Sequence, residues 1–278
     1  MKQIFAVLIL ITFSFVSFGQ QSKDTKKNFD VADFNKKFET VQWLVAYDEV
    51  AWKTSDVAMA EDKDKAEIAR LGAEWFCLQD SKNLWHAFYG KFENDKFTMI
   101  FHYTIAPDGK INRSTDKFDQ AFLDAHARAL VTAKAKLKTS IPPNSPLFNQ
   151  YIRKNSDGTF GVWMLPAFQT DGSAIFGGEA YYSIDSTGSK ILKEDSYFQP
   201  NFRGFKSSPP REIWLNYREL EKPTLGTVFF VWYYKSYFTN IIIDNAKSTS
   251  TVVKDGKNGY IWVHVEKDEK SQPKPPKG

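Results

Sequence analysis

Short runs of aromatic and β-branched residues, separated by turn residues, limit what the first half of this chain can fold into. Residues 74–79, 84–93 and 97–106 have the composition typical of strands. The segments between them, 80–83 and 94–96, are made of aspartate, asparagine, serine and lysine, and the first three of these favour turns. Consecutive strands joined by such short turns predict an antiparallel meander.

Similar runs recur after residue 147, and the connections between them also carry turn residues, among them Asp157-Gly158. Residues 199–211 hold three prolines and are expected to form a loop. The expected strands cover residues 151–154, 160–165, 180–184, 190–197, 213–218, 228–234, 239–243, 249–254 and 260–266.

Helical spacing is confined to the first half of the sequence. We expect one helix from Asp30 or Asp33 to about residue 53, a shorter one over 61–72, and a third over about 116–138 that Ser114 or Thr115 could cap. Strands and helices do not alternate regularly. The predicted class is therefore α+β, with mainly antiparallel, meandering sheets and three helices in the N-terminal half.

The strongest internal boundary is the segment 141–146, which contains three prolines. It divides the chain into a helical and β-meander unit at 30–140 and a β-rich unit at 147–266. Residues 267–278 are charged and proline-rich, which predicts a disordered tail.

Residues 1–19 have the pattern of a cleavable signal peptide. Lys2 precedes an apolar stretch from residue 4 to residue 18, and Ser17 and Gly19 occupy the positions of a cleavage site. An uncleaved anchor is the alternative. Cys77 is the one cysteine of the chain and lies far from the cleavage point, so a lipid anchor there is not expected. Residues 20–278 contain no second apolar run of membrane length, which predicts an exported protein, periplasmic or extracellular, without an integral membrane span.

The charge balance, the cysteine content and the missing motifs exclude a nucleic-acid partner, an internal disulfide and a cofactor in turn. Without Lys2 the chain carries 36 basic and 33 acidic residues, too even a balance for a nucleic-acid-binding protein. With one cysteine, no internal disulfide is possible. Phosphate-binding loops, dinucleotide fingerprints and zinc-protease motifs are absent from the sequence, and no cofactor is expected.

Few residues qualify as catalytic or metal-binding candidates. Glu179 follows Gly177-Gly178 before an expected strand, and it is the candidate catalytic acid of a glycosidase-like pair whose second member the sequence does not identify. His86 and His102 lie on neighbouring expected strands and could share a face, but local hydrogen bonding explains them better than a metal. Cys77 is expected to be a buried small side chain.

Aromatic residues are abundant, with 24 Phe, 12 Tyr and 8 Trp. Tyr182, Trp232 and Tyr234 belong to the densest clusters and are the candidate binding residues, because flat rings can stack on sugars. If these segments are strands, at least one residue of each adjacent pair faces outward. Packing in the core is the alternative for the same rings.

Two segments together resemble a known group of proteins. Residues 160–198 contain Leu-Pro-Ala, then Gly-Gly-acid-x-Tyr, then a glycine turn, and residues 223–265 run from Pro-Thr through an apolar stretch to Trp-Val. This order resembles a group of uncharacterised exported bacterial proteins of Bacteroidota type, with Glu179 where that group usually has aspartate. The resemblance implies that residues 147–265 form one structural unit, and it implies no activity.

These observations predict an exported protein with a non-catalytic binding or interaction role. The expected partner is a carbohydrate or an envelope protein. Two alternatives remain open: a hydrolase acting on envelope or extracellular polysaccharide, with Glu179 as one acid, and a structural or assembly factor of the cell envelope.

Overall fold

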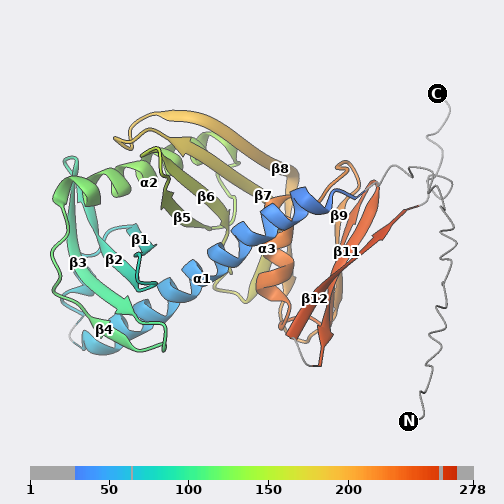
Figure 1. The fold of residues 1–278 in the computed structure, drawn as a ribbon, viewed down its shortest axis with the longest axis horizontal. Helices are drawn as coiled ribbons and strands as arrows, with labels where there is room; N and C mark the ends of the chain where they lie inside the picture. The colour runs from blue at the N-terminus through green and yellow to red at the C-terminus, as the bar shows by residue number, and fades with distance from the viewer. Residues whose placement is uncertain (1–28, 64, 257–258, 268–278) are drawn as a thin grey trace, which may run out of the picture.

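The computed structural model describes residues 29–63, 65–256 and 259–267. The predicted leader at 1–19 and residues 268–278 of the predicted tail lie outside the described residues. Three α-helices and three four-stranded sheets make up the described chain, so the α+β class is confirmed (Figure 1). The helices are α1 (Val31–Glu61), α2 (Gln120–Ser140) and α3 (Leu225–Tyr234), and Ile68–Arg70 form a short 3-10 turn.

Each sheet is assembled mainly from hairpins. The first two sheets are antiparallel meanders in chain order, and the third is antiparallel except where β9 runs parallel to β10. The first sheet contains β1 (Glu74–Gln79), β2 (Trp85–Glu93), β3 (Lys96–Ile105) and β4 (Ile111–Arg113). The middle sheet contains β5 (Phe148–Lys154), β6 (Phe160–Pro166), β7 (Ser173–Ile184) and β8 (Ile191–Lys206). The last sheet contains β9 (Glu212–Tyr217), β10 (Asn240–Asn245), β11 (Ser248–Asp255) and β12 (Gly259–Glu266).

Helix α1 is longer than the sequence pattern predicted. It begins at the N-cap Asp30, whose carboxylate accepts a hydrogen bond from the Asp33 amide at 3.0 Å, and it continues to Glu61. Nothing in residues 54–61 interrupts a helix, since that segment contains neither glycine nor proline. The helix expected over 61–72 is wrong: the described part of that segment holds the 3-10 turn Ile68–Arg70.

The third helix lies in the C-terminal half, so confinement of the helices to the N-terminal half is wrong. Val228–Tyr234, expected to be a strand, belongs to α3. Its aromatic and β-branched residues favour a strand by composition, but Thr224 caps a helix by accepting a hydrogen bond from the Thr227 amide at 3.2 Å. Phe229 packs in one core cluster and Phe230 in the other, which explains a helix that is apolar all round.

Two further boundaries differ from the predictions. Helix α2 is capped by Asp119, which accepts from the Phe122 amide at 2.8 Å, and not by Ser114 or Thr115. The loop expected over 199–211 is mostly strand, because β8 continues to Lys206 and pairs with the start of β7.

The middle sheet is covered on both faces. On one face Lys136 of α2 pairs with Glu194 of β8 at 3.0 Å. Glu194 lies opposite Tyr182 of β7, so Tyr182 shares this α2 face. Side chains alternate along β7, so Glu179 and Tyr181 face the opposite side of the sheet from Tyr182, toward α1 and α3. Figure 1 shows α1 beginning beside the last sheet, passing the middle one and ending beside the first sheet.

One core cluster extends across the predicted boundary at 141–146. It contains Leu44 of α1, Phe88 of β2 and Leu130 of α2 together with Val162 of β6. A second cluster lies between α3, β7 and the last sheet and includes Phe176 and Ile243. Among the described helices, none is both long and apolar enough to cross a membrane.

Candidate functional site

Glu179 is placed by an irregularity in β7. The pairing of β7 with β8 shifts register between Phe176 and Gly178, and Gly177 has φ +100°, a conformation that side chains disfavour. A Cβ at Gly178 would lie 2.3 Å from the ring of Phe202, so the second glycine is required for close packing. Beyond this bulge Glu179 lies opposite Tyr197 of β8.

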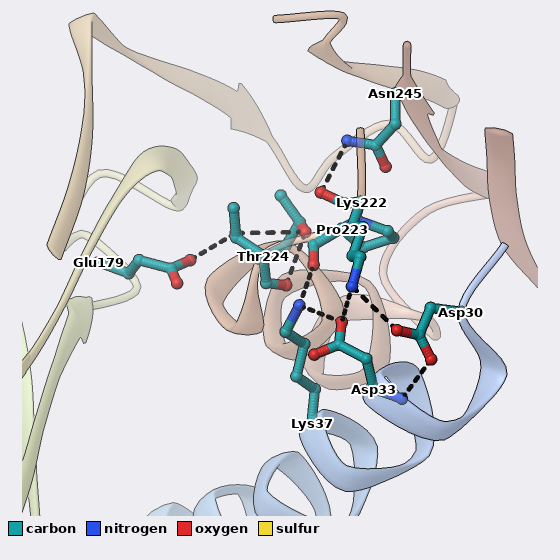
Figure 2. Close-up of polar contacts among 9 residues, drawn as sticks. Asp30, Asp33, Lys37, Glu179, Lys222, Pro223, Thr224 and Asn245 are labelled. Carbon is teal, nitrogen blue, oxygen red and sulfur yellow. Dashed lines mark hydrogen bonds and ion pairs between the residues drawn. The ribbon is translucent and has the colours of Figure 1, made fainter. Parts of the chain in front are cut away.

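The Glu179 carboxylate contacts the first turn of α3. Its Oε2 accepts a hydrogen bond from the Thr224 hydroxyl at 2.5 Å (Figure 2). It accepts another from the Gly226 amide at 2.5 Å. An anion at this place is favourable, because the first amides of a helix lack partners and its N-terminus is partly positive. Glu179 therefore joins β7 to α3.

Burial raises the pKa of Glu179 to about 7. The hydrogen bonds from Thr224 and Gly226 and the positive charge of Lys37 act in the opposite direction but do not offset the loss of hydration. A carboxyl with this pKa is partly protonated near neutral pH, which is a property shared by catalytic acids and by buried structural carboxyls.

The start of α1 forms a second wall beside Glu179. Lys37 donates to the Asp33 carboxylate at 2.7 Å and to the Pro223 carbonyl at 2.9 Å. Lys222 pairs with Asp30 at 2.9 Å (Figure 2). The hydrogen bond from the backbone amide of Asp33 lowers the pKa of Asp30, and the hydrogen bond from Lys222 lowers it further. These contacts tie the N-terminus of α1 to the segment that leads into α3.

Between these elements lies a cleft of about 830 Å³, here called the Glu179 cleft. Its floor is the α1-facing side of β6, β7 and β8, where Trp163, Tyr181 and Asp195 lie opposite one another across the strands. The rings of Trp163 and Tyr181 are 4.9 Å apart, and the Arg153 guanidinium lies over Trp163 at 5.4 Å. The other charged or ring-bearing residues of the lining are Asp33, Lys36, Lys37, Glu179, Tyr197, Glu221 and Lys222.

Of the residues singled out from the sequence, the Glu179 cleft contains Glu179 alone. Tyr182 is fully buried on the α2 face of the middle sheet. Trp232 and Tyr234 lie on α3 and not on a strand, so the argument from alternating faces does not apply to them. Trp232 packs against Phe38 at 4.7 Å, and Tyr234 is buried beside a second hollow described below. Their role in binding stays a prediction.

Sequence reasoning missed the other residues that line the floor of the Glu179 cleft. Tyr181 was within reach, since it alternates with the chosen Tyr182 and therefore takes the opposite face. Asp195 and Arg153 carried no local signal, because strand pairing brings them to the cleft from residues 16 positions downstream and 26 positions upstream of Glu179.

The surroundings of His86, His102 and Cys77 favour structural roles over metal binding or thiol chemistry. His86 and His102 do share a face, and their ring nitrogens are 3.0 Å apart, with Asp80 3.7 Å from His86. Across the described ranges, no group of three or more His, Cys, Asp or Glu side chains is arranged to hold a metal ion. Cys77 is buried, and burial raises the pKa of its thiol well above the usual value, which disfavours the reactive thiolate.

Comparisons of the chain with protein-family models, with curated proteins and with solved structures gave no match. The resemblance of residues 160–198 and 223–265 to exported bacterial proteins therefore stays a prediction. The geometry of the Glu179 cleft is the basis on which a function can be argued.

Proposed function

We propose that this protein binds a carbohydrate in the Glu179 cleft without transforming it. The observation that carries the proposal is the combination, within one cleft of about 830 Å³, of aromatic rings on a sheet floor with cations and acids on the walls. The volume falls within the range of small-molecule sites, roughly 300–1,000 Å³.

The chemistry of the lining favours a neutral ligand rich in hydroxyl groups. Lys36 and Arg153 are exposed beside the equally exposed Asp195, so both signs of charge are available to a ligand. Hydroxyl groups can donate to carboxylates and accept from lysine or arginine, whereas a strongly charged ligand would meet repulsion from one of the two sets. The half-buried ring of Tyr181 offers an apolar surface for one face of a sugar ring.

Glu179 has a structural role that makes a catalytic one unnecessary. Its Oε2 already accepts hydrogen bonds from Thr224 and Gly226, and these bonds hold α3 against β7. A carboxyl with this task is explained by packing and helix capping, without a substrate.

A hydrolase is the second candidate, and one observation favours it. Glu179 has a pKa of about 7 and shares the α1-facing side of the sheet with Asp195, whose negative charge contributes to raising that pKa. Two carboxyl groups on one face of a cleft are what glycoside hydrolysis requires.

The proposal includes export. Residues 1–19, which lie outside the described residues, have the order of charged, apolar and small residues of a signal peptide. A protein in the periplasm or outside the cell encounters polysaccharide, which fits a carbohydrate ligand.

The proposal is tested by calorimetric titration with maltose, cellobiose and N,N′-diacetylchitobiose. We expect saturable binding of at least one of them, weakened about three- to tenfold by Tyr181→Ala because the ring no longer contacts the sugar. Tyr260→Ala is the matched control, since Tyr260 is also half-buried but lies on β12. Equal effects of the two substitutions, or no binding of any disaccharide, would contradict the proposal.

The same samples separate binding from hydrolysis. Reducing ends are measured after long incubation of each disaccharide, and of the corresponding polysaccharides, with wild type and Glu179→Gln. We expect that neither protein increases the number of reducing ends. Release by wild type that is abolished by Glu179→Gln would establish the hydrolase instead.

A further inference from the structure

A second hollow, of about 360 Å³, lies where α1, β5, the β6–β7 connection and α3 meet. Most of its wall is aromatic, and one acid lies within it. It is here called the aromatic cup, and the residues that define it are Asp48, Trp52, Phe168, Tyr233, Tyr234 and Tyr237.

Several rings of the aromatic cup are open to solvent. Trp52 is 65% exposed, Tyr237 45% and Phe168 41%. The ring of Phe168 lies 5.9 Å from that of Tyr234 and 6.0 Å from that of Tyr237. Large exposed rings gathered around one hollow mark an interaction site more often than single scattered ones do.

Asp48 of α1 lies within the cup and is 7% exposed. Its Oδ1 accepts hydrogen bonds from the Tyr151 hydroxyl at 2.8 Å and the Asn149 amide at 3.0 Å. Its Oδ2 accepts from the Tyr233 hydroxyl at 2.6 Å. The carboxylate is thus fixed in position by three donors from β5 and α3.

All three of these donors are neutral. Among the described residues that line the cup, Asp48 is the one that carries a charge. Burial raises the pKa of Asp48, and the hydrogen bonds from Tyr233, Tyr151 and Asn149 oppose this shift. A buried carboxylate is costly unless a positive charge accompanies it, and among the described residues Asp48 has hydrogen bonds and no ion pair.

We propose that the aromatic cup binds a substituted ammonium group, with its carbon substituents against the rings and its charge near Asp48. Aromatic faces attract such cations, most strongly where water is excluded, and a nearby carboxylate neutralises the charge. A bare divalent cation is a poorer fit, because calcium takes six to eight oxygen ligands and the cup offers one carboxylate.

The probe is choline, titrated into the full chain by calorimetry at pH about 8, where carboxyl groups are ionised. The matched ligand is 3,3-dimethylbutan-1-ol, which has nearly the shape of choline without its charge. We expect saturable choline binding, and binding of the neutral alcohol at least about tenfold weaker, since the charge supplies much of the interaction.

Three variants locate the site. Asp48→Asn keeps the shape of the side chain and should weaken choline binding about tenfold or more, while Trp52→Ala should weaken it several-fold. Trp214→Ala is the matched control, because Trp214 is 52% exposed on β9, outside the cup. Trp52 is exposed enough that its removal should leave the fold intact, and this is checked by circular dichroism.

Each other outcome overturns the proposal. Absence of choline binding at millimolar concentration would contradict it. Equal binding of the neutral alcohol would contradict it too, and would indicate an apolar or carbohydrate ligand. Unchanged choline binding in both Asp48→Asn and Trp52→Ala would place the cation elsewhere. Loss of choline binding in Tyr181→Ala, whose side chain lines the Glu179 cleft and not the cup, would also place the cation elsewhere.

Discussion

Histidines lie among aromatic rings at three places in the described chain, and two of them, His102 and His126, are buried, whereas His264 is half-buried. His126 of α2 lies 4.0 Å from the ring of Phe122 and 4.7 Å from that of Phe160, and His102 of β3 lies 4.6 Å from that of Phe88. Loss of hydration lowers the pKa of both histidines to about 4, and His264 is lowered to about 4 for the same reason. These side chains are therefore neutral in the folded protein across the physiological range.

The sign of the resulting pH dependence follows from proton binding. In the unfolded chain a histidine binds its proton near pH 6.5, whereas His126 in the folded protein does so near 4. Its contribution to stability is complete above about pH 6.5 and is lost as the pH falls toward 4. Glu179 acts oppositely in part of this range, because its pKa in the folded protein is raised to about 7.

Comparison with His126→Phe isolates the histidine from Glu179. The variant loses a hydrogen bond to the Phe122 carbonyl at every pH. On going from pH 7.5 to 4.5, however, we expect the free energy of unfolding of the variant to rise relative to wild type by about 2–3 kcal/mol. Urea denaturation at the two pH values measures this. An unchanged difference would mean that His126 is protonated normally in the folded protein.

At the scale of elements, the contact between β7 and α3 depends on a glycine. A Cβ at Gly226 would lie 2.3 Å from Glu179 Oε2, inside any normal contact. We expect Gly226→Ala to lower the free energy of unfolding by about 1–3 kcal/mol, because Glu179 has to move away from the helix amides. The direction is informative, since alanine ordinarily stabilises a helix by about 1 kcal/mol relative to glycine.

Gly256→Ala is the control for this prediction. A Cβ at Gly256 would meet nothing within 4 Å, so the substitution should change stability little. Both variants are measured by urea denaturation with the wild type. If Gly226→Ala were as stable as the wild type or more stable, Glu179 would not be held against α3 in the way described.

An element is predictable from the sequence when neighbouring residues specify it, and not when distant contacts do. The hairpins were predictable because turn residues such as Asn94-Asp95 and Asp157-Gly158 mark them locally. Helix α3 was not, because its aromatic composition favours a strand and its helical state depends on burial between two core clusters. Glu179 was identified from its glycines, but Asp195 was not, since strand pairing alone places it beside Tyr181.

On the scale of the whole molecule, the two predicted units share one core. The cluster with Leu44 and Phe88 of the first unit also contains Tyr151 and Val162 of the second. Asp48 adds polar contacts across the same boundary through Asn149, Tyr151 and Tyr233. The division at 141–146 therefore separates segments of sequence that pack together.

This shared core predicts cooperative unfolding. We expect one transition in differential scanning calorimetry, with equal calorimetric and van't Hoff enthalpies, because the larger core cluster is built from both units and would be split by unfolding either one. Two resolved transitions would instead support independent units at 30–140 and 147–266.

The carbohydrate site is tested most directly by a crystal structure of the chain grown with whichever of maltose, cellobiose and N,N′-diacetylchitobiose binds most tightly. We expect the sugar to lie in the Glu179 cleft, with one ring against Tyr181 and its hydroxyl groups hydrogen-bonded to Arg153 and Asp195. We expect its glycosidic bond to be intact. A sugar bound elsewhere, an empty cleft at saturating ligand, or a cleaved glycosidic bond next to Glu179 would contradict the proposal.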